Sequence, residues 1–164
     1  MERSSYMLPV AVGCSYNRCK FCTLFRHLKY RELPMEQIEG ELERVRNLGG
    51  NPKHVFLGDG NAFGLDTGRL LKITDLIHRY FPDCCAINMD ATVTNIRAKS
   101  QEELQALRAA GIRHLYLGIE SGLDDVLVRM EKDHNLDQAY RQIDRIQNAG
   151  FIYDAHIMTG IAGH

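Results

Sequence analysis

Three cysteines lie within nine residues near the N-terminus, and thiolates are strong metal ligands. They are Cys14, Cys19 and Cys22. Three thiolates on one loop can ligate three irons of a [4Fe–4S] cluster, which leaves the fourth iron free to bind a small molecule. Thiolates also bind zinc, which takes four ligands, and His27 would complete the pattern Cys-x4-Cys-x2-Cys-x4-His. The spacing therefore predicts a metal site, with iron–sulfur favoured over zinc.

The composition is that of one globular domain over residues 1–164. The chain has 20 Lys and Arg against 21 Asp and Glu, and 45% of its residues are hydrophobic. A net charge of −1 gives no indication of nucleic-acid or membrane binding. The longest uncharged stretch, residues 4–17, is too short and too polar to span a bilayer, and no signal peptide is recognisable. These features predict a cytoplasmic protein.

The cysteine count also argues against a secreted disulfide scaffold. Five cysteines are an odd number, and three of them are clustered in one short segment. The remaining two, Cys84 and Cys85, adjoin an apolar stretch and are interpreted as small buried hydrophobic residues.

Strand-like apolar runs alternate with amphipathic helical stretches along the chain. The predicted strands are residues 7–12, 55–57, 84–89, 114–119 and 151–158. The predicted helices are residues 34–48, 67–80, 100–111, 123–130 and 136–148. Ser100 and Glu103 form a capping-box pattern at the start of the third helix. This alternation predicts an α/β fold with a parallel sheet.

Two architectures fit this order of elements. One is a five-stranded doubly wound sheet of flavodoxin type. The other is a partial (β/α) barrel, because a complete barrel of eight units needs about 250 residues. The chain ends on a strand and the glycine-containing residues 160–164, so we expect a barrel truncated after about five strands and a domain incomplete at its C-terminus. Both architectures place functional groups after strand carboxyl ends, where the cysteine loop lies.

Three segments resemble the iron–sulfur oxidoreductase branch of the radical S-adenosylmethionine (SAM) superfamily. They are residues 13–22 (GCSYNRCKFC), 104–122 (LQALRAAGIRHLYLGIESG) and 160–163 (GIAG). The resemblance extends from about residue 8 to the last residue. It implies a partial (β/α)6 barrel whose [4Fe–4S] cluster binds SAM and cleaves it reductively to a 5′-deoxyadenosyl radical, which abstracts hydrogen from a substrate. It also implies an external electron donor, while the residues do not identify the substrate.

The resemblance carries over to individual positions. Cys14, Cys19 and Cys22 would ligate the cluster, although the first gap holds four residues where the family most often has three. Residues matching the family's SAM contacts are Phe21, Asp59, Gly60, Asn61, Glu120, Ser121 and Gly160. Asp59-Gly60-Asn61 replaces the family's Gly-Gly-Glu, so either Asp59 or Asn61 would hold the SAM amino group.

Other interpretations of the same residues stay open. Phe21 is equally suited to anchor the loop, Ser121 to cap a helix, and Gly160 to form a turn. Asp90 and Thr92 follow the third predicted strand and point either to the same face or into solvent. The alternative function is a zinc-stabilised, non-catalytic binding module that uses Cys14, Cys19, Cys22 and His27. A third reading is an inactive, truncated piece of a radical enzyme.

Overall fold

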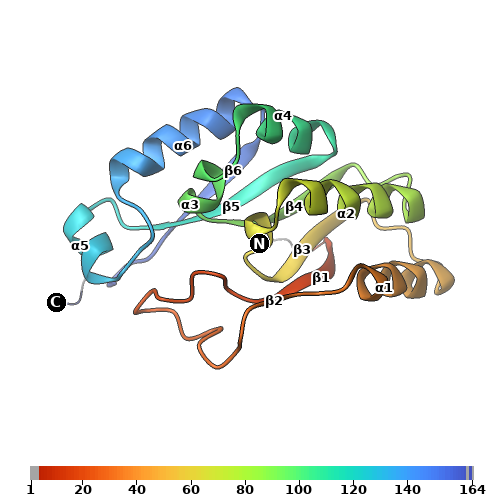
Figure 1. Cartoon of the computed structure of the whole chain (residues 1–164), viewed down its shortest axis with the longest axis horizontal. Coiled ribbons are helices and arrows are strands. Elements are labelled where there is room, and N and C mark those ends of the chain that lie inside the picture. The colour runs from red at the N-terminus through yellow and green to blue at the C-terminus, as the bar shows by residue number, and fades with distance from the viewer. Residues whose placement is uncertain (1–3, 162, 164) are drawn as a thin grey trace.

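A computed structural model describes residues 4–161 and 163 (Figure 1). Within them, one sheet has the strand order β2-β1-β3-β4-β5-β6. Its strands are β1 (Tyr6–Gly13), β2 (Arg31–Glu32), β3 (His54–Gly60), β4 (Ala86–Ala91), β5 (Ile112–Glu120) and β6 (Ile152–Ile157). The helices are α1 (Met35–Asn47), η1 (Ala62–Gly64), α2 (Thr67–Tyr80), α3 (Val93–Arg97), α4 (Gln101–Ala109), α5 (Asp124–Arg129) and α6 (Leu136–Asn148). Ala162 and His164, in the predicted C-terminal turn, lie outside the described residues.

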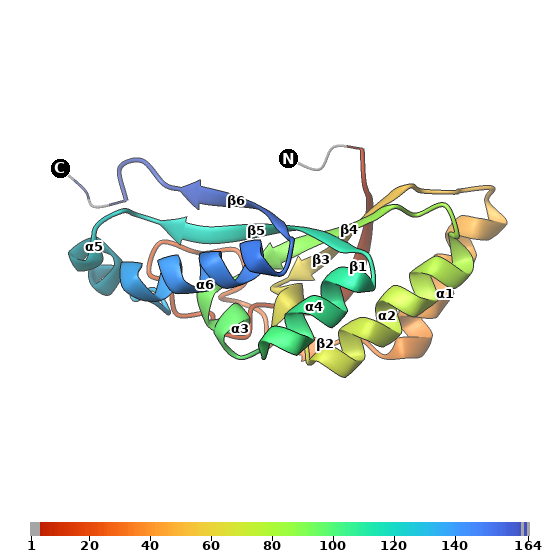
Figure 2. The same ribbon diagram turned by 90° about the horizontal axis from the view of Figure 1, so that it is seen from above.

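The sheet has the arrangement of a partial barrel. Strands β1, β3, β4, β5 and β6 are parallel and adjacent in chain order, and helices α1, α2, α4 and α6 lie on one side of them (Figure 2). A doubly wound sheet would reverse its strand order and place helices on both faces. The flavodoxin-type alternative is therefore wrong, and the expected partial (β/α) barrel is confirmed. The sheet does not close, since β2 and β6 are its two edges.

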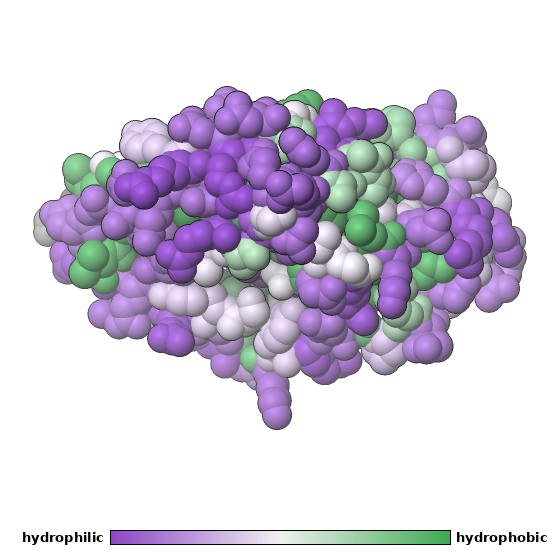
Figure 3. All heavy atoms as spheres, turned by 45° about the horizontal axis from the view of Figure 1, so that its top comes forward, coloured by the Kyte–Doolittle hydropathy of each residue, from purple (hydrophilic) through white to green (hydrophobic). Residues whose placement is uncertain are grey.

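The hydrophobic core lies between the sheet and the helices. Alternate strand residues such as Val55 and Leu57 point to this side, where they meet the apolar stripe of each helix. Ile38 and Leu42 of α1 are fully buried, whereas Leu48 is 77% exposed because the helix ends at Asn47. The side that carries α4 and α6 is mostly hydrophilic (Figure 3). No helix in the described part of the chain is long and apolar enough to cross a membrane.

Several local features differ from the sequence prediction. The short elements β2, η1 and α3 were not predicted, because two to five residues carry too little periodicity. Strand β3 continues through Asp59 and Gly60, three residues beyond the predicted strand at 55–57. The capping box of Ser100 and Glu103 is confirmed, with the Glu103 carboxylate accepting from the Ser100 amide at 2.7 Å.

Candidate functional site

A cavity of about 250 Å³ lies at the carboxyl ends of the parallel strands, where the cysteine loop folds over the sheet. The loop joins β1 to β2 and supplies one wall, and the ends of β3, β4 and β5 supply the opposite wall. The lining residues are Cys14, Tyr16, Cys19, Phe21, Cys22, Phe25, Gly60, Asn61, Asp90, Ala91, Thr92, Tyr116, Gly118, Glu120, Lys132, Asp133 and His156. The three clustered cysteines thus share one cavity.

One arginine holds the turn that carries two of these cysteines. The Arg26 guanidinium donates to the carbonyl oxygens of Cys22 at 2.8 Å, Cys19 at 3.0 Å and Lys20 at 3.1 Å. Asn17 closes the other side of the loop by donating to the Phe25 carbonyl at 2.9 Å. Because loop backbone lacks the regular bonds of helices and strands, these side chains fix the positions of the thiols.

The thiols themselves are free and half-buried. Burial raises the pKa of Cys19, and Asp133 and the two other cysteines raise it further, while Lys132 acts in the opposite direction. A bound metal cation would favour the thiolate form of Cys19. Among the described residues no three His, Cys, Asp or Glu side chains are grouped to hold a single metal ion, and His27 is exposed and does not line the cavity. The structure does not assemble the four-ligand zinc site considered above.

The end of β3 brings an unpaired amide to the cavity. Gly60 packs against Gly13 of β1 so closely that an added Cβ would lie 2.2 Å from the Gly13 carbonyl oxygen. The next residue, Asn61, is 6% exposed, and neither its amide nitrogen nor its amide oxygen has a hydrogen-bond partner within the described residues. Buried polar groups almost always have a partner. An unpaired amide that lines a cavity therefore indicates a place for a polar ligand.

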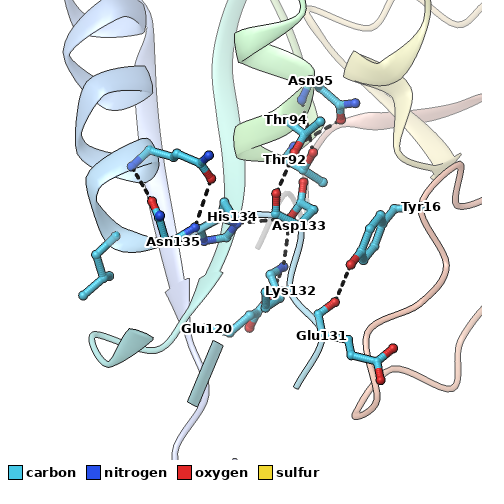
Figure 4. A network of polar contacts seen from close by, with 12 residues as sticks. Tyr16, Thr92, Thr94, Asn95, Glu120, Glu131, Lys132, Asp133, His134 and Asn135 are labelled. Atoms are coloured by element: carbon cyan, nitrogen blue, oxygen red, sulfur yellow. Dashed lines mark hydrogen bonds and ion pairs between the residues drawn. The ribbon is translucent and has the colours of Figure 1, made fainter. Parts of the chain in front are cut away.

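A buried lysine in the α5–α6 connection forms the centre of a charged network beside the cysteine loop (Figure 4). The Lys132 side chain is 5% exposed, and its Nζ lies 3.7 Å from Glu120 Oε1 and 4.0 Å from Asp133 Oδ1. It also lies 5.9 Å from the centre of the Phe21 ring. Burial alone would raise the pKa of Asp133, but hydrogen bonds from His134 and Thr94 outweigh it and hold that pKa well below its usual value. Two carboxylates thus fix one cation at the cavity wall.

Backbone geometry around this network is unusual. Glu120 has φ 71° at the end of β5, a conformation that costs a non-glycine residue about 1–3 kcal/mol. Gly118 leaves the room for its carboxylate, since a Cβ there would lie 2.5 Å from Glu120 Oε1. Glu131 has φ 52°, and its carbonyl accepts from the Tyr16 hydroxyl at 2.6 Å, which ties the α5–α6 connection to the cysteine loop. Strain of this kind is typical of functional sites.

The structure separates the residues chosen from sequence into two groups. Those that line the cavity are Cys14, Cys19, Cys22, Phe21, Gly60, Asn61, Glu120, Asp90 and Thr92. Those that do not are Asp59, Ser121 and Gly160. Asp59 is exposed at the end of β3, and the Ser121 hydroxyl accepts from the Leu123 amide at 3.2 Å as a local turn. Gly160 is exposed with φ 76°.

Sequence reasoning missed eight lining residues, among them Tyr116, Lys132, Asp133 and His156. Tyr116 of β5 and His156 of β6 both line the cavity, with ring centres 5.8 Å apart. Lys132 and Asp133 follow a short helix, and only the tertiary structure brings them to the cysteines. Their signal in the sequence is the run of four ionisable residues at 131–134, Glu-Lys-Asp-His.

Comparison with known sequences places the chain among proteins of one family. The family model described as "Radical SAM superfamily" matches residues 8–164. The heme chaperone HemW of Bacillus subtilis is 26% identical over 153 residues, which cover 92% of this chain and 40% of HemW. The tRNA-2-methylthio-N(6)-dimethylallyladenosine synthase of Chlorobium phaeobacteroides is 25% identical over 164 residues, covering 95% of this chain and 36% of the synthase. The chain spans about two fifths of the length of these relatives.

Solved structures share the fold. OxsB, a cobalamin-dependent SAM radical enzyme solved with aqua-cobalamin and SAM bound, gives a TM-score of 0.76 at 19% identity and covers 94% of this chain and 24% of OxsB. Coproporphyrinogen III oxidase (HemN) from Escherichia coli, described as a radical SAM enzyme, gives a TM-score of 0.69 at 17% identity, with 93% and 36% covered.

Proposed function

Because this chain belongs to the Radical SAM superfamily, we propose that its cavity holds a [4Fe–4S] cluster and SAM as the core of an enzyme that removes a hydrogen atom from a substrate. When bound, the cluster supplies the electron that cleaves SAM reductively to a 5′-deoxyadenosyl radical. The protein's part is to ligate the cluster, orient SAM and shield the radical from solvent.

The observation that carries this proposal is the joint presence of three thiols and unpaired polar groups in one cavity. Cys14, Cys19 and Cys22 supply three of the four ligands that a [4Fe–4S] cluster can take, which leaves one iron open. The wider spacing of the first two cysteines is compatible with this donor set, since each thiolate binds its own iron. Assembly of the cluster replaces the thiol protons with iron.

The remaining cavity residues match the polar groups of SAM. The Asn61 amide oxygen is a free acceptor for the SAM ammonium group, and Asp59 lies outside the cavity. Lys132 is a buried cation suited to the SAM carboxylate. The Glu120 carboxylate can accept from ribose hydroxyls, and Phe21 offers an apolar face to the adenine. These four side chains would orient SAM against the thiol wall.

An external electron donor and a location in the reducing cytoplasm complete the proposal. The five cysteines are all unpaired, as expected of such a compartment.

The test is anaerobic reconstitution of the chain with iron and sulfide, followed by electron paramagnetic resonance of the dithionite-reduced protein with and without SAM. We expect a [4Fe–4S]⁺ signal that changes when SAM is added. The Cys14→Ala/Cys19→Ala/Cys22→Ala variant is expected to bind neither iron nor sulfide.

Two results would contradict the proposal. A cluster whose electron paramagnetic resonance signal is unchanged by SAM would identify the chain as an inactive fragment. Stoichiometric zinc that survives air, and is lost in His27→Ala, would assign the cysteines to the zinc-stabilised binding module.

A further inference from the structure

A fully buried histidine, His134, lies behind the charged network of the cavity. Its side chain is 0% exposed, and its Nδ1 lies 3.1 Å from Asp133 Oδ1 (Figure 4). Because an ionised carboxylate only accepts hydrogen bonds, Nδ1 carries a proton and donates it to this bond. The other ring nitrogen, Nε2, is buried without a hydrogen-bond partner in the described part of the chain. His134 does not line the cavity, so it can act on the site only through Asp133.

The Asp133 carboxylate depends on this contact for its orientation. Its side chain is 4% exposed, and a buried carboxylate is costly unless it is paired. The Lys132 ammonium lies 4.0 Å away, which is too far for a hydrogen bond. Thr94 donates to the Asp133 carbonyl oxygen at 3.0 Å, and this bond fixes the backbone but not the rotation of the side chain. The bond from His134 therefore sets the direction in which the carboxylate points.

The Lys132 ammonium in turn depends on Asp133. Its Nζ lies 3.7 Å from Glu120 Oε1 and 4.0 Å from Asp133 Oδ1. Both distances exceed a normal hydrogen bond, so the N–H donors of the ammonium are available to a ligand. Lysine has a flexible four-carbon stem, and the two carboxylates together determine where its charge lies. Without a correctly placed Asp133, the ammonium would move toward Glu120.

We propose that His134 is a positioning residue, which through Asp133 holds the Lys132 ammonium in the place where it meets the carboxylate of SAM. This proposal rests on the proposed function, which assigns SAM to the cavity. His134 itself does not touch SAM. Partners behind the groups that contact a ligand orient those groups, and their loss weakens binding although no direct contact is removed.

The other role open to His134 is packing at the start of a helix. It directly precedes Asn135, the N-cap of α6, where a side chain often packs against the first turns. Leucine fills such a position at least as well as histidine, but it cannot donate to Asp133. Asparagine is smaller and keeps an N–H close to the place of Nδ1. The two substitutions therefore separate packing from the hydrogen bond.

The experiment compares His134→Leu and His134→Asn with wild type after anaerobic reconstitution of the cluster. The matched control is His78→Leu, which replaces a half-buried histidine of α2 that does not line the cavity. Calorimetry measures the affinity for SAM, and urea unfolding measures the stability of each protein. A carbon-13 NMR titration of the iron-free chain follows the Asp133 carboxyl group and does not depend on SAM.

We expect His134→Leu to bind SAM about tenfold more weakly than wild type, the factor typical of one lost hydrogen bond to a charged group. His134→Asn should stay within about twofold of wild type because it keeps the donor. The control should not change SAM affinity. In the titration, the Asp133 pKa should stay low in wild type and His134→Asn but rise in His134→Leu, because burial is then opposed by fewer hydrogen bonds.

Unchanged SAM affinity in His134→Leu, with a raised Asp133 pKa, would overturn the positioning role and leave the proposed function intact. Equal losses of SAM affinity in the leucine and asparagine variants, with equal falls in the urea midpoint, would assign His134 to packing instead. A wild-type chain that assembles the cluster but does not bind SAM would overturn both proposals.

Discussion

Arg26 is expected to control how firmly the cluster is held. Its guanidinium makes three hydrogen bonds to the carbonyls of the Cys19–Cys22 turn, at 2.8 to 3.1 Å. A bond involving a charged group contributes about 1.5–3 kcal/mol when shielded, but Arg26 is exposed and water replaces much of each bond. We therefore assign about 0.5 kcal/mol to each of the three hydrogen bonds, so that together they stabilise the turn by roughly 1–2 kcal/mol.

This energy is confined to the loop, because the three acceptors all lie within one turn. Arg26→Gln should release iron about 5–30-fold faster than wild type when an anaerobic chelator is added to the reconstituted protein, the factor that corresponds to 1–2 kcal/mol. The urea midpoint of the whole domain should change little. Arg26→Lys keeps the charge but not the planar fork, so it should restore only part of the retention.

Arg79→Gln is the matched control, since Arg79 is an exposed arginine on α2 that pairs with Asp75 at 2.8 Å. Iron release from Arg26→Gln at the rate of this control would refute the positioning role. Full rescue by lysine would show that charge, and not the three-way fork, holds the turn.

Three further results are expected. Gly60→Ala should destabilise the domain by about 1–3 kcal/mol in urea unfolding, because its Cβ would lie 2.2 Å from the Gly13 carbonyl oxygen. The control Gly40→Ala, which has open space around it, should stabilise α1 by about 0.5–1 kcal/mol, and equal effects of the two changes would contradict the close contact of Gly60 with Gly13. Asn61→Ala should leave the urea midpoint unchanged, since no hydrogen bond is lost, and weaken SAM binding about tenfold by calorimetry; a lowered midpoint would argue for a structural role. Lys132→Met should weaken SAM binding to the reconstituted protein more than Lys132→Arg, which keeps the positive charge. Equal SAM affinities of the two variants would contradict a role for the charge of Lys132, which pairs with Glu120.

The sequence was sufficient for the parts of the fold that rest on local periodicity. The five parallel strands, the long helices and the Ser100 capping box follow from apolar spacing and cap chemistry, which act over a few residues. The cysteine spacing likewise predicted a metal loop after the first strand. Short elements such as β2 and α3 escaped because they are stabilised by their neighbours, not by their own pattern.

The tertiary structure decided which residues of the motifs reach the cavity. Asp59 and Asn61 are two positions apart and both polar, but Asp59 is exposed within β3 with φ 63°, whereas Asn61 lies past the strand end, before η1, and is buried without a hydrogen-bond partner in the described residues. The order of the strands in the sheet and the position of the helices on one side of it distinguish the partial barrel from a doubly wound sheet. Both features depend on how strands pair across the molecule.

Lys132 illustrates the limit of sequence reasoning most directly. It lies 110 residues beyond Cys22 in the chain, and no local pattern links the two. The loop after α5 folds back onto the cysteine loop through Tyr16 and Lys20, and this contact brings the cation to the thiol wall. The sequence by itself predicted the three clustered thiols as ligands and determined the order of the elements. Only long-range packing determined the charges that surround those thiols, because electrostatic environments are set by distance in space and not along the chain.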